Sequence, residues 1–283
     1  MMICRRYFGS LAAILPWFSP CAFADSTDTQ LEEIVVTAQK REQNFNDVGV
    51  AISVLSSADV AAAGIKTLVD VASQTPNLQM KNVLGNSITN VSIRGIGLND
   101  YAVNNNPAAG IYVDNVYLVS PAMLTFGLFD IDRIEVLKGP QGDLYGRNTT
   151  AGAMNFVSRK PSAANDVEME AGYGNYENWH LNGEVGGTIA PTLTGRFSLQ
   201  TVQQNSGWQT NYLTGQEVGK IDRTAGRVQL DWKPNDGVNV LFSAHAGYDH
   251  SDVDLIKVVN VLTPLGSQYA NQPYVSGAGN NPH

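Results

Sequence analysis

The residues best suited to chemistry lie near the end of the chain. The segment Asp249-His250-Ser251-Asp252-Val253-Asp254 brings three carboxylates and an imidazole together. Carboxylate oxygens are the ligands that divalent cations such as Ca²⁺ prefer, so this segment is a candidate cation site. It lacks the central glycine and the terminal glutamate of an EF-hand loop. The spacing therefore favours an exposed, solvated loop over a metal site.

Motifs of the common enzyme classes are missing from the sequence. It contains no Gly-x-Ser-x-Gly, no His-Glu-x-x-His and no phosphate-binding loop, and its four histidines are scattered along the chain. We therefore expect no enzymatic activity and no catalytic residue. We also expect no covalently bound cofactor and no resident metal.

Residues 1–24 have the three parts of a secretory signal peptide. The Arg5-Arg6 pair precedes an apolar stretch from Tyr7 to Phe18, and Ala22-Phe23-Ala24 fits the small-x-small cleavage pattern. The apolar stretch is too short to span a membrane as a helix. Two alternatives stay open, a twin-arginine export signal and a lipoprotein signal that uses Cys21.

Cleavage after Ala24 changes the composition of the chain. Both cysteines, Cys4 and Cys21, leave with the signal peptide, so the mature chain has no thiol and no disulfide. The formal charge moves from −8 to −10, because 16 Lys and Arg residues then stand against 26 Asp and Glu residues. A chain this acidic is poorly suited to nucleic acid, whose phosphates require a basic surface. We therefore exclude nucleic acid as a partner.

A short apolar run stands isolated in the polar segment 25–44. Its residues Ile34, Val35, Val36, Thr37 and Ala38 are β-prone and uncharged. Five residues cannot form a core or cross a membrane. The run is either the first strand of the following domain or a strand that adds to a sheet edge of another protein.

Residues 45–160 alternate short apolar runs with turn residues, which predicts a compact α+β domain. A first helix is expected at Ala58–Ala63, capped by Ser56 or Ser57 and ended by Gly64. A second is expected at Thr67–Ser73. Short strands bounded by Gly, Pro or Asn are expected at 50–55, 91–94, 110–114, 133–137 and 153–157.

Residues 166–283 follow a different pattern, with long stretches in which apolar and polar residues alternate. Strands of about ten residues with this alternation and with aromatic residues near their ends are typical of outer-membrane β-barrels. Five such strands are expected, around 167–173, 179–185, 193–199, 224–232 and 238–248. A soluble β-sandwich is the alternative, although its strands usually have only about five or six residues.

The connections between these strands also alternate. Ala190-Pro191-Thr192 and Lys233–Gly237 are tight turns, whereas Gln203–Ile221 and the segment after Asp249 are long. Short turns at one end and long loops at the other are typical of outer-membrane barrels. The connection Gly174–Asn178 is short for its side. No later segment has the roughly 18 consecutive apolar residues that a membrane helix needs.

The most specific motif lies between the two regions. Asp130-Ile131-Asp132-Arg133-Ile134-Glu135-Val136-Leu137-Lys138-Gly139-Pro140-Gln141-Gly142 is followed by Leu144-Tyr145-Gly146-Arg147-Asn148 and by Gly152-Ala153-Met154-Asn155. This sequence resembles the plug of TonB-dependent outer-membrane receptors. Arg94-Gly95 and Ile111-Tyr112-Val113-Asp114 precede it in the order expected of that family, as does the run Ile34–Ala38.

The resemblance implies a plug domain inside an antiparallel transmembrane barrel of about 22 strands. It implies that Ile34–Ala38 is the TonB box, which pairs with the energy-coupling protein TonB. It also implies the outer membrane of a Gram-negative bacterium, with its lipid and lipopolysaccharide, as the location. The expected function is active import of a scarce nutrient, above all an iron chelate of a siderophore. Cobalamin, heme and carbohydrate are the alternative substrates.

Two groups of site residues follow from this resemblance. The charged residues Arg94, Arg133, Glu135 and Arg147 are candidates for a latch between the plug and barrel carboxylates such as Glu168, Glu170 or Glu184, and the alternative is that they pair within the plug. The loop 98–107 is the first candidate for substrate contact, through Asn99, Asp100, Tyr101, Asn104 and Asn105. The segment 82–87 is the second, and Trp208 and Tyr212 could add aromatic contacts.

Five strands cannot enclose a plug, because even an eight-stranded barrel is filled by its own side chains. They would also leave open strand edges in lipid. We therefore expect an incomplete barrel, the N-terminal part of a longer receptor. The alternative is a periplasmic plug-like fragment that binds without transporting. The segment 25–33 is too short to fold as an additional signalling domain.

Overall fold

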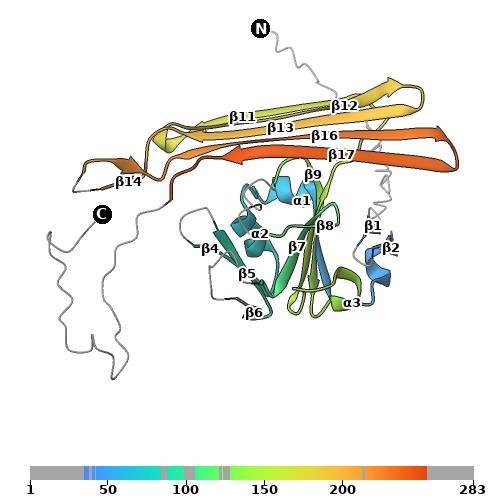
Figure 1. Ribbon diagram of the computed structural model, residues 1–283, viewed down its shortest axis with the longest axis horizontal. Helices are drawn as coiled ribbons and strands as arrows, with labels where there is room; N and C mark the ends of the chain where they lie inside the picture. The colour runs from blue at the N-terminus through green and yellow to red at the C-terminus, as the bar shows by residue number, and fades with distance from the viewer. Residues whose placement is uncertain are drawn as a thin grey trace, which may run out of the picture. The chain divides into compact units, whose positions relative to one another are not determined.

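The computed structural model describes residues 35–37, 40–41, 43–83, 88–98, 106–120, 123, 128–211 and 214–253. An α+β domain comes first along the chain, and five long strands follow it (Figure 1). Its strands are β1 (Val35–Val36), β2 (Gln43–Asn44), β3 (Ile52–Ser56), β4 (Leu78–Val83), β5 (Ile88–Ile93), β6 (Ile96–Gly97), β7 (Ala109–Val113), β8 (Val116–Tyr117), β9 (Ile131–Lys138) and β10 (Gly152–Ser158). Its helices are η1 (Phe45–Asp47), α1 (Ser57–Ala62), α2 (Leu68–Gln74) and α3 (Gly142–Tyr145).

The main sheet of the α+β domain has the strand order β3-β9-β10-β7-β8. The strands β10 and β7 are parallel, and the other neighbours are antiparallel. A smaller antiparallel sheet, β4-β5-β6, lies in the same domain. Strand β9 therefore has a hydrogen-bonded partner along both edges.

Both expected helices of this domain are present, and their first turns explain where they begin. The Ser56 hydroxyl accepts from the Asp59 amide (3.1 Å), while the Asp59 carboxylate accepts from the Ser56 amide (2.9 Å). This capping box satisfies amides that would otherwise lack a partner at the start of α1. It also decides between Ser56 and Ser57 as the cap. Asp70 accepts from the Thr67 amide in the same way before α2.

The side chains of the main sheet divide between two apolar clusters because successive residues of a strand point to opposite faces. One cluster contains Ile134, Met154 and Phe156 and packs against α1 and α2 residues such as Val60 and Val71. The other face carries the second cluster, which consists of Val36, Tyr112, Leu137, Tyr145 and Ala153. The charged residues Arg133 and Glu135 alternate with Ile134 and Val136 and therefore share the face of the second cluster.

The long strands form one antiparallel sheet, β11-β12-β13-β16-β17, which we call the strand wall (Figure 1). Their bounds are β11 (Asp166–Gly174), β12 (Asn178–Ala190), β13 (Leu193–Gln204), β16 (Ile221–Asn235) and β17 (Val238–Asp249). The tight turns expected after β12 and β16 are both present. The short connection after β11 contains the 3-10 turn η3 (Asn175–Glu177).

In the strand wall, apolar side chains lie on the exposed face and polar side chains lie on the covered face, which is the reverse of a soluble β-sandwich. The apolar side chains are the exposed ones: Val167 is 76% exposed, Met169 78% and Tyr173 77%. The polar side chains Arg196 and Gln229 are 5% and 2% exposed. An apolar outer face with a polar inner face is the arrangement of a barrel in lipid. The sandwich alternative therefore does not describe this sheet.

The segment between β13 and β16 is a small hairpin and not the simple loop expected from the sequence. It contains β14 (Gln209–Thr210) and β15 (Glu217–Val218). The buried Gln204 amide nitrogen donates to the Gly219 carbonyl (2.9 Å) and ties the base of the hairpin together. None of the described helices has the length and the apolar character needed to cross a membrane.

Candidate functional site

The candidate docking strand lies at the N-terminal end of the described chain. Val35 and Val36 form β1, which pairs antiparallel with Asn44 and Gln43 of β2. Val35 is 43% exposed, but Val36 is fully buried in the second apolar cluster. The described residues of the run, 35–37, therefore pack against the α+β domain, as expected under the alternative that the run is a first strand of this domain. Ile34 and Ala38, the ends of the predicted run, lie outside the described residues.

Thr37 connects this strand to the centre of the main sheet. Its backbone amide donates to Oε1 of Glu135 (2.8 Å), and its hydroxyl donates to Oε1 and Oε2 of the same carboxylate (3.1 and 3.3 Å). Arg133 donates from Nε to Glu135 (2.8 Å) and from Nη2 to the Thr37 hydroxyl (3.2 Å). Glu135 has no exposed surface. We call the three side chains Thr37, Arg133 and Glu135 the arm clasp.

Aromatic residues complete the surface on which the strand lies. The Tyr112 hydroxyl donates to the Tyr145 carbonyl (2.7 Å), and the two rings meet edge to face at 4.8 Å. The Lys40 ammonium lies 5.2 Å from the centre of the Tyr145 ring. Burial raises the pKa of the Tyr145 phenol well above its ordinary value, and the nearby Glu135 and Tyr112 act in the same direction. Tyr145 therefore stays neutral at physiological pH.

A second set of contacts joins the α+β domain to the strand wall. Arg196 of β13 donates from Nε and Nη2 to the two oxygens of Asp130 (2.7 and 2.6 Å), and from Nη1 to Asp166 (2.8 Å). The Ser198 hydroxyl also donates to Asp130. Asp130 adopts a left-handed backbone conformation (φ 51°) just before β9, and its side chain is fully buried. We call Asp130, Arg196 and Ser198 the wall anchor.

Strand β16 adds two further contacts beside the wall anchor. Arg227 donates from Nη2 to the Phe129 carbonyl (2.7 Å) and stacks over the Phe129 ring at 4.7 Å. The Gln229 amide donates to the Ser158 hydroxyl (2.9 Å). Both side chains are almost completely buried. The residues that hold the two regions together therefore surround Asp130 and the end of β10.

The four residues predicted to latch the plug to carboxylates of the barrel wall have other surroundings in the structure. Arg133 and Glu135 bind each other and Thr37 within the α+β domain, and in the described part of the chain neither reaches a carboxylate of the strand wall. Arg94 and Arg147 are exposed. Glu168 does pair with an arginine, but with Arg159 (2.6 Å). The buried arginines of the contact sit on the strand wall, because the wall turns its polar face inward.

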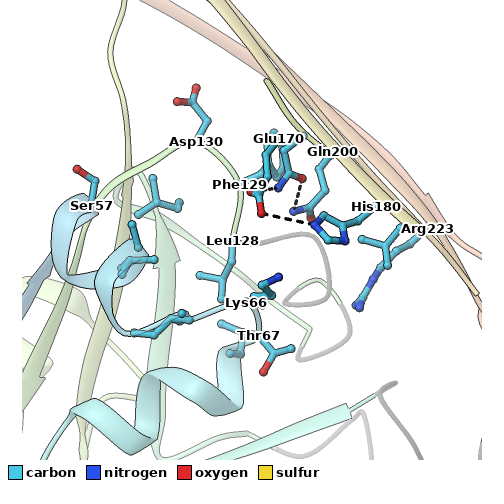
Figure 2. A pocket seen from close by; sticks show the side chains of 18 of the residues that line it. Ser57, Lys66, Thr67, Leu128, Phe129, Asp130, Glu170, His180, Gln200 and Arg223 are labelled. Atoms are coloured by element: carbon cyan, nitrogen blue, oxygen red, sulfur yellow. Dashed lines mark hydrogen bonds and ion pairs between the residues drawn. The ribbon is translucent and has the colours of Figure 1, made fainter. Parts of the chain in front are cut away.

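A cavity of about 630 Å³ lies between the first two helices and the inner face of the strand wall (Figure 2). One side is mostly apolar, with Val60, Ile65, Leu68 and Leu128 among its residues. Side chains of the wall line the other side, including Glu170, His180, Asn182, Gln200 and Arg223. Its volume is within the range of small-molecule sites.

The polar side of the cavity is organised by hydrogen bonds that run across three strands. The Asn182 amide donates to Glu170 (3.1 Å), and the Gln200 amide donates to Asn182 (3.1 Å). His180 lies 3.5 Å from the Glu170 carboxylate. Gly172 leaves space for the His180 ring of the neighbouring strand, and a Cβ atom there would require this ring to move. This surface offers donors and acceptors to a polar solute.

The remaining predicted sites have different outcomes. Asn99, Asp100, Tyr101, Asn104 and Asn105 lie outside the described residues. Asn82 forms part of β4, and Trp208 is 49% exposed on the β14–β15 hairpin. The chain described by the structure contains no group of His, Cys, Asp and Glu side chains that could hold a metal ion.

The acidic segment after β17 has a structural role in its described residues 249–253. The Asp249 carboxylate accepts from the Ser251 amide (2.9 Å), and the Asp252 carboxylate accepts from the Lys220 amide (3.1 Å). The chain continues beside the start of β16, where the His250 amide donates to the Asp222 carbonyl (2.8 Å) and the Asp252 amide donates to the Lys220 carbonyl (2.9 Å). The described residues of this segment are half-buried or exposed and are tied to residues 220 and 222 by hydrogen bonds.

Comparison with known proteins gives these features a context. Residues 44–153 match the family model "TonB-dependent Receptor Plug Domain". The pesticin receptor of Yersinia pestis is 27% identical over 220 residues, which are 76% of this chain and 32% of that protein. The vitamin B12 transporter BtuB of Photobacterium profundum is 26% identical and is matched over 67% of this chain and 31% of its own length. The chain thus spans about a third of the length of these curated relatives.

Solved structures show the same arrangement of domain and strands. The ferric yersiniabactin uptake receptor FyuA of Yersinia pestis aligns with a TM-score of 0.62 and 27% identity, over 70% of this chain and 31% of that one. The ferripyoverdine receptor of Pseudomonas aeruginosa aligns with a TM-score of 0.61 over 76% of this chain and 27% of that one; its 16% identity supports the fold alone. The expected fold class, an α+β plug domain followed by antiparallel strands of an outer-membrane barrel, is therefore confirmed. Residues 44–153 therefore form a plug domain of the TonB-dependent receptor type, and the chain as a whole is similar to the N-terminal part of such receptors.

Proposed function

We propose that the whole receptor, of which this chain provides the plug and the first barrel strands, imports a ferric siderophore across the outer membrane of a Gram-negative bacterium. The observation that carries this proposal is the alignment with the ferric yersiniabactin uptake receptor, which extends from the plug into the strand wall at 27% identity. The iron chelate is the transported substrate and not a resident cofactor. The loop residues Asn99, Asp100, Tyr101, Asn104 and Asn105 are the proposed contacts with it, and lipopolysaccharide and lipid surround the apolar face of the wall.

We propose further that residues 1–24 direct export and that Ile34–Ala38 is the TonB box within the arm 25–44. A strand of this length binds through backbone hydrogen bonds along a sheet edge. Each such bond contributes about 0.5–1.5 kcal/mol, so the contact with TonB is reversible. The proposed domain bounds, 45–160 for the plug and 166–283 for the barrel strands and loops, agree with the end of β10 at Ser158 and the start of β11 at Asp166.

The substitution Val35→Pro tests the coupling to TonB. Proline removes a backbone donor and cannot continue a strand ladder. We expect uptake of ⁵⁵Fe-labelled yersiniabactin by cells that express the protein to fall to the background level, with unchanged amounts of protein in the outer membrane. Thr29→Pro, in the polar segment before the run, is the matched control and should leave uptake intact. Equal uptake by both variants would contradict the coupling role.

Import of cobalamin is the second candidate function, because the vitamin B12 transporter BtuB is 26% identical over 67% of this chain. The same cells distinguish the two by uptake of ⁵⁷Co-labelled cyanocobalamin. Uptake of cobalt label without uptake of iron label would replace the first candidate by the second. If neither label enters and the purified protein binds neither compound, the protein acts on another substrate or does not transport.

A further inference from the structure

We infer that the cavity between the first two helices and the strand wall is a binding site for a small amphipathic organic acid, whose carboxylate is received by Arg223. None of the residues that carry this inference belongs to the loop 98–107, which is proposed to contact the transported substrate. The inference therefore does not depend on which compound the receptor transports.

The pairing of the wall strands places the polar lining of the cavity in two neighbouring rows. One row contains His180, Val202 and Arg223, which are register partners on β12, β13 and β16. The next row contains Asn182 and Gln200, which are register partners on β12 and β13. All five residues line the cavity. A single ligand can therefore contact the guanidinium of one row and the amides of the other.

Arg223 differs from the other charged groups of this lining because its charge has no bound partner. Asp130 is held in the wall anchor, and Arg159 pairs with Glu168 (2.6 Å). Arg223 is half-buried, and its guanidinium forms no hydrogen bond or ion pair with the residues that the structure describes. Asp249, its register partner on β17, acts on it electrostatically without forming an ion pair. The guanidinium is thus available to an anion that enters the cavity.

The acidic side chains of the lining lie too far away to pair with Arg223. Glu170 is on β11, three strands from β16, which is roughly 14 Å at about 4.8 Å between strands. Glu184 is in the row of Arg227, four residues further along, which adds roughly 13 Å along the strand axis. Both separations exceed the ~4 Å of an ion pair.

A second cation faces the cavity from the opposite side. Lys66 lies in the connection between α1 and α2 and lines the cavity together with Arg223 (Figure 2). The ammonium of Lys66 forms no ion pair within the described part of the chain. The region between these two residues therefore favours a negative charge over a positive one, because a cationic ligand would be repelled from both sides.

The plug side of the cavity supplies the apolar half of the site. Ile65 and Leu68 belong to the first apolar cluster, and Val60 and Leu128 pack against it. Apolar surface of a ligand that is buried here contributes about 25 cal/mol per Å². The planar guanidinium of Arg223 offers two parallel donors, which match the two oxygens of a carboxylate. A short aromatic or aliphatic acid combines these two features and fits within 630 Å³.

Three compounds with one apolar body and different head groups test the chemistry of the site. They are 4-fluorobenzoate, 4-fluorobenzamide and protonated 4-fluorobenzylamine, and their binding to the protein purified from outer membranes in detergent is followed by ¹⁹F NMR. We expect saturable binding of the benzoate, at least about tenfold weaker binding of the neutral amide, and no saturable binding of the amine. Equal binding of all three compounds, or preferred binding of the amine, would overturn the inference.

Substitution of Arg223 shows whether this residue receives the carboxylate. Arg223→Gln should weaken binding of 4-fluorobenzoate at least about tenfold and leave its affinity close to that of the amide. Arg223→Lys keeps the charge without the paired donors and should bind the benzoate with intermediate affinity. Lys233→Gln is the matched control, because it removes a positive charge from the other end of β16, where the side chain is 60% exposed and pairs with Asp231. Its affinity for the benzoate should be unchanged.

Photolabelling locates the bound compound and does not require a variant to fold. Irradiation with 4-azidobenzoate, followed by mass spectrometry of peptides, should modify the segments 57–69, 178–184, 200–202 or 221–223, which contribute to the cavity. An excess of 4-fluorobenzoate should abolish this modification, and 4-fluorobenzylamine should not. Protected labelling only at other segments would contradict the assignment to this cavity, as would equal affinity of Arg223→Gln and the unmodified chain for the benzoate.

Discussion

Arg196 holds Asp130 with two nearly parallel hydrogen bonds, from Nε to one carboxylate oxygen (2.7 Å) and from Nη2 to the other (2.6 Å). This fork geometry fits arginine and not lysine, because only the planar guanidinium offers two donors side by side. The Arg196 side chain is 4% exposed and the Asp130 side chain is not exposed at all. The pair thus joins the plug to the strand wall in a place that water does not reach.

Removing one member of this pair should be strongly destabilising. Arg196→Gln leaves the Asp130 carboxylate buried without its main partner, which typically costs about 3–5 kcal/mol. Denaturant unfolding of the folded protein in detergent measures this loss. Arg159→Gln, which removes the more exposed pair with Glu168, is the control and should cost at most about 1 kcal/mol. Equal losses in the free energy of unfolding would contradict the prediction that the wall anchor contributes more to stability than the exposed pair Arg159–Glu168.

The double variant Asp130→Asn/Arg196→Gln should recover part of the loss. Asparagine accepts the left-handed backbone of position 130, so the substitution removes the charge and keeps the turn. Residues in direct contact show coupling energies of about 0.5–3 kcal/mol in such cycles. Strict additivity of the two single losses would contradict the direct pairing of these side chains.

Gly152 of β10 should not tolerate a larger residue, because of its backbone conformation and because there is no space for a Cβ atom. Gly152 has a φ of +150°, and a Cβ atom at this position would overlap the Leu137 carbonyl oxygen of the neighbouring strand β9. We expect Gly152→Ala to lower the free energy of unfolding by about 1–3 kcal/mol through this overpacking. Gly142→Ala, at the start of α3, meets no atom within 4 Å and should change it by less than about 0.5 kcal/mol.

The burial of Tyr145 in the second apolar cluster should make the stability of the plug decrease at alkaline pH. Burial raises the pKa of Tyr145 above its ordinary value of 10.0, with Glu135 and Tyr112 adding to the shift. Below pH 10 the phenol is neutral in both the folded and the unfolded chain, so its contribution to stability is fully present. Above pH 10 only the unfolded chain ionises, and stability falls as the pH rises.

Unfolding midpoints measured between pH 8 and pH 11 test this dependence. In Tyr145→Phe the decline above pH 10 should be weaker, because phenylalanine has no proton to lose. Tyr176→Phe replaces a tyrosine that is 53% exposed and should show the same decline as the unmodified chain. A decline of equal steepness in all three chains would assign the alkaline sensitivity to other groups.

The regular elements were predictable from the sequence because their patterns are local. In β11 and β13, every second residue lies on the exposed apolar face, so the alternation around Met169 and Phe197 defines both the strand and its exposed face. The cap at Ser56 and the stop at Gly64 define α1 in the same way. The hairpin β14–β15 was missed because its strands have two residues each and depend on the bond from Gln204 to Gly219.

The contacts of the candidate site were much harder to predict. Thr37 and Glu135 are 98 residues apart, and Asp130 and Arg196 are 66 apart, so no local pattern connects them. The sequence directs attention to the arginines of the plug and the carboxylates of the wall. The sequence did contain a signal that arginines of the wall bind partners in the plug. Arg196 and Arg227 are on the polar face of their strands, which points inward, and a buried charged side chain requires a partner.

Strand β9 begins one residue after Asp130 and contains Glu135, so the wall anchor and the arm clasp lie at two points of the same strand. At about 3.3 Å per residue, the five steps between them span roughly 16 Å along the strand axis. One strand of the central sheet therefore connects the contact with the N-terminal segment to the contact with the strand wall. Its ladders with β3 and β10 hold it along both edges, so the spacing of the two contacts is fixed as long as the sheet is intact.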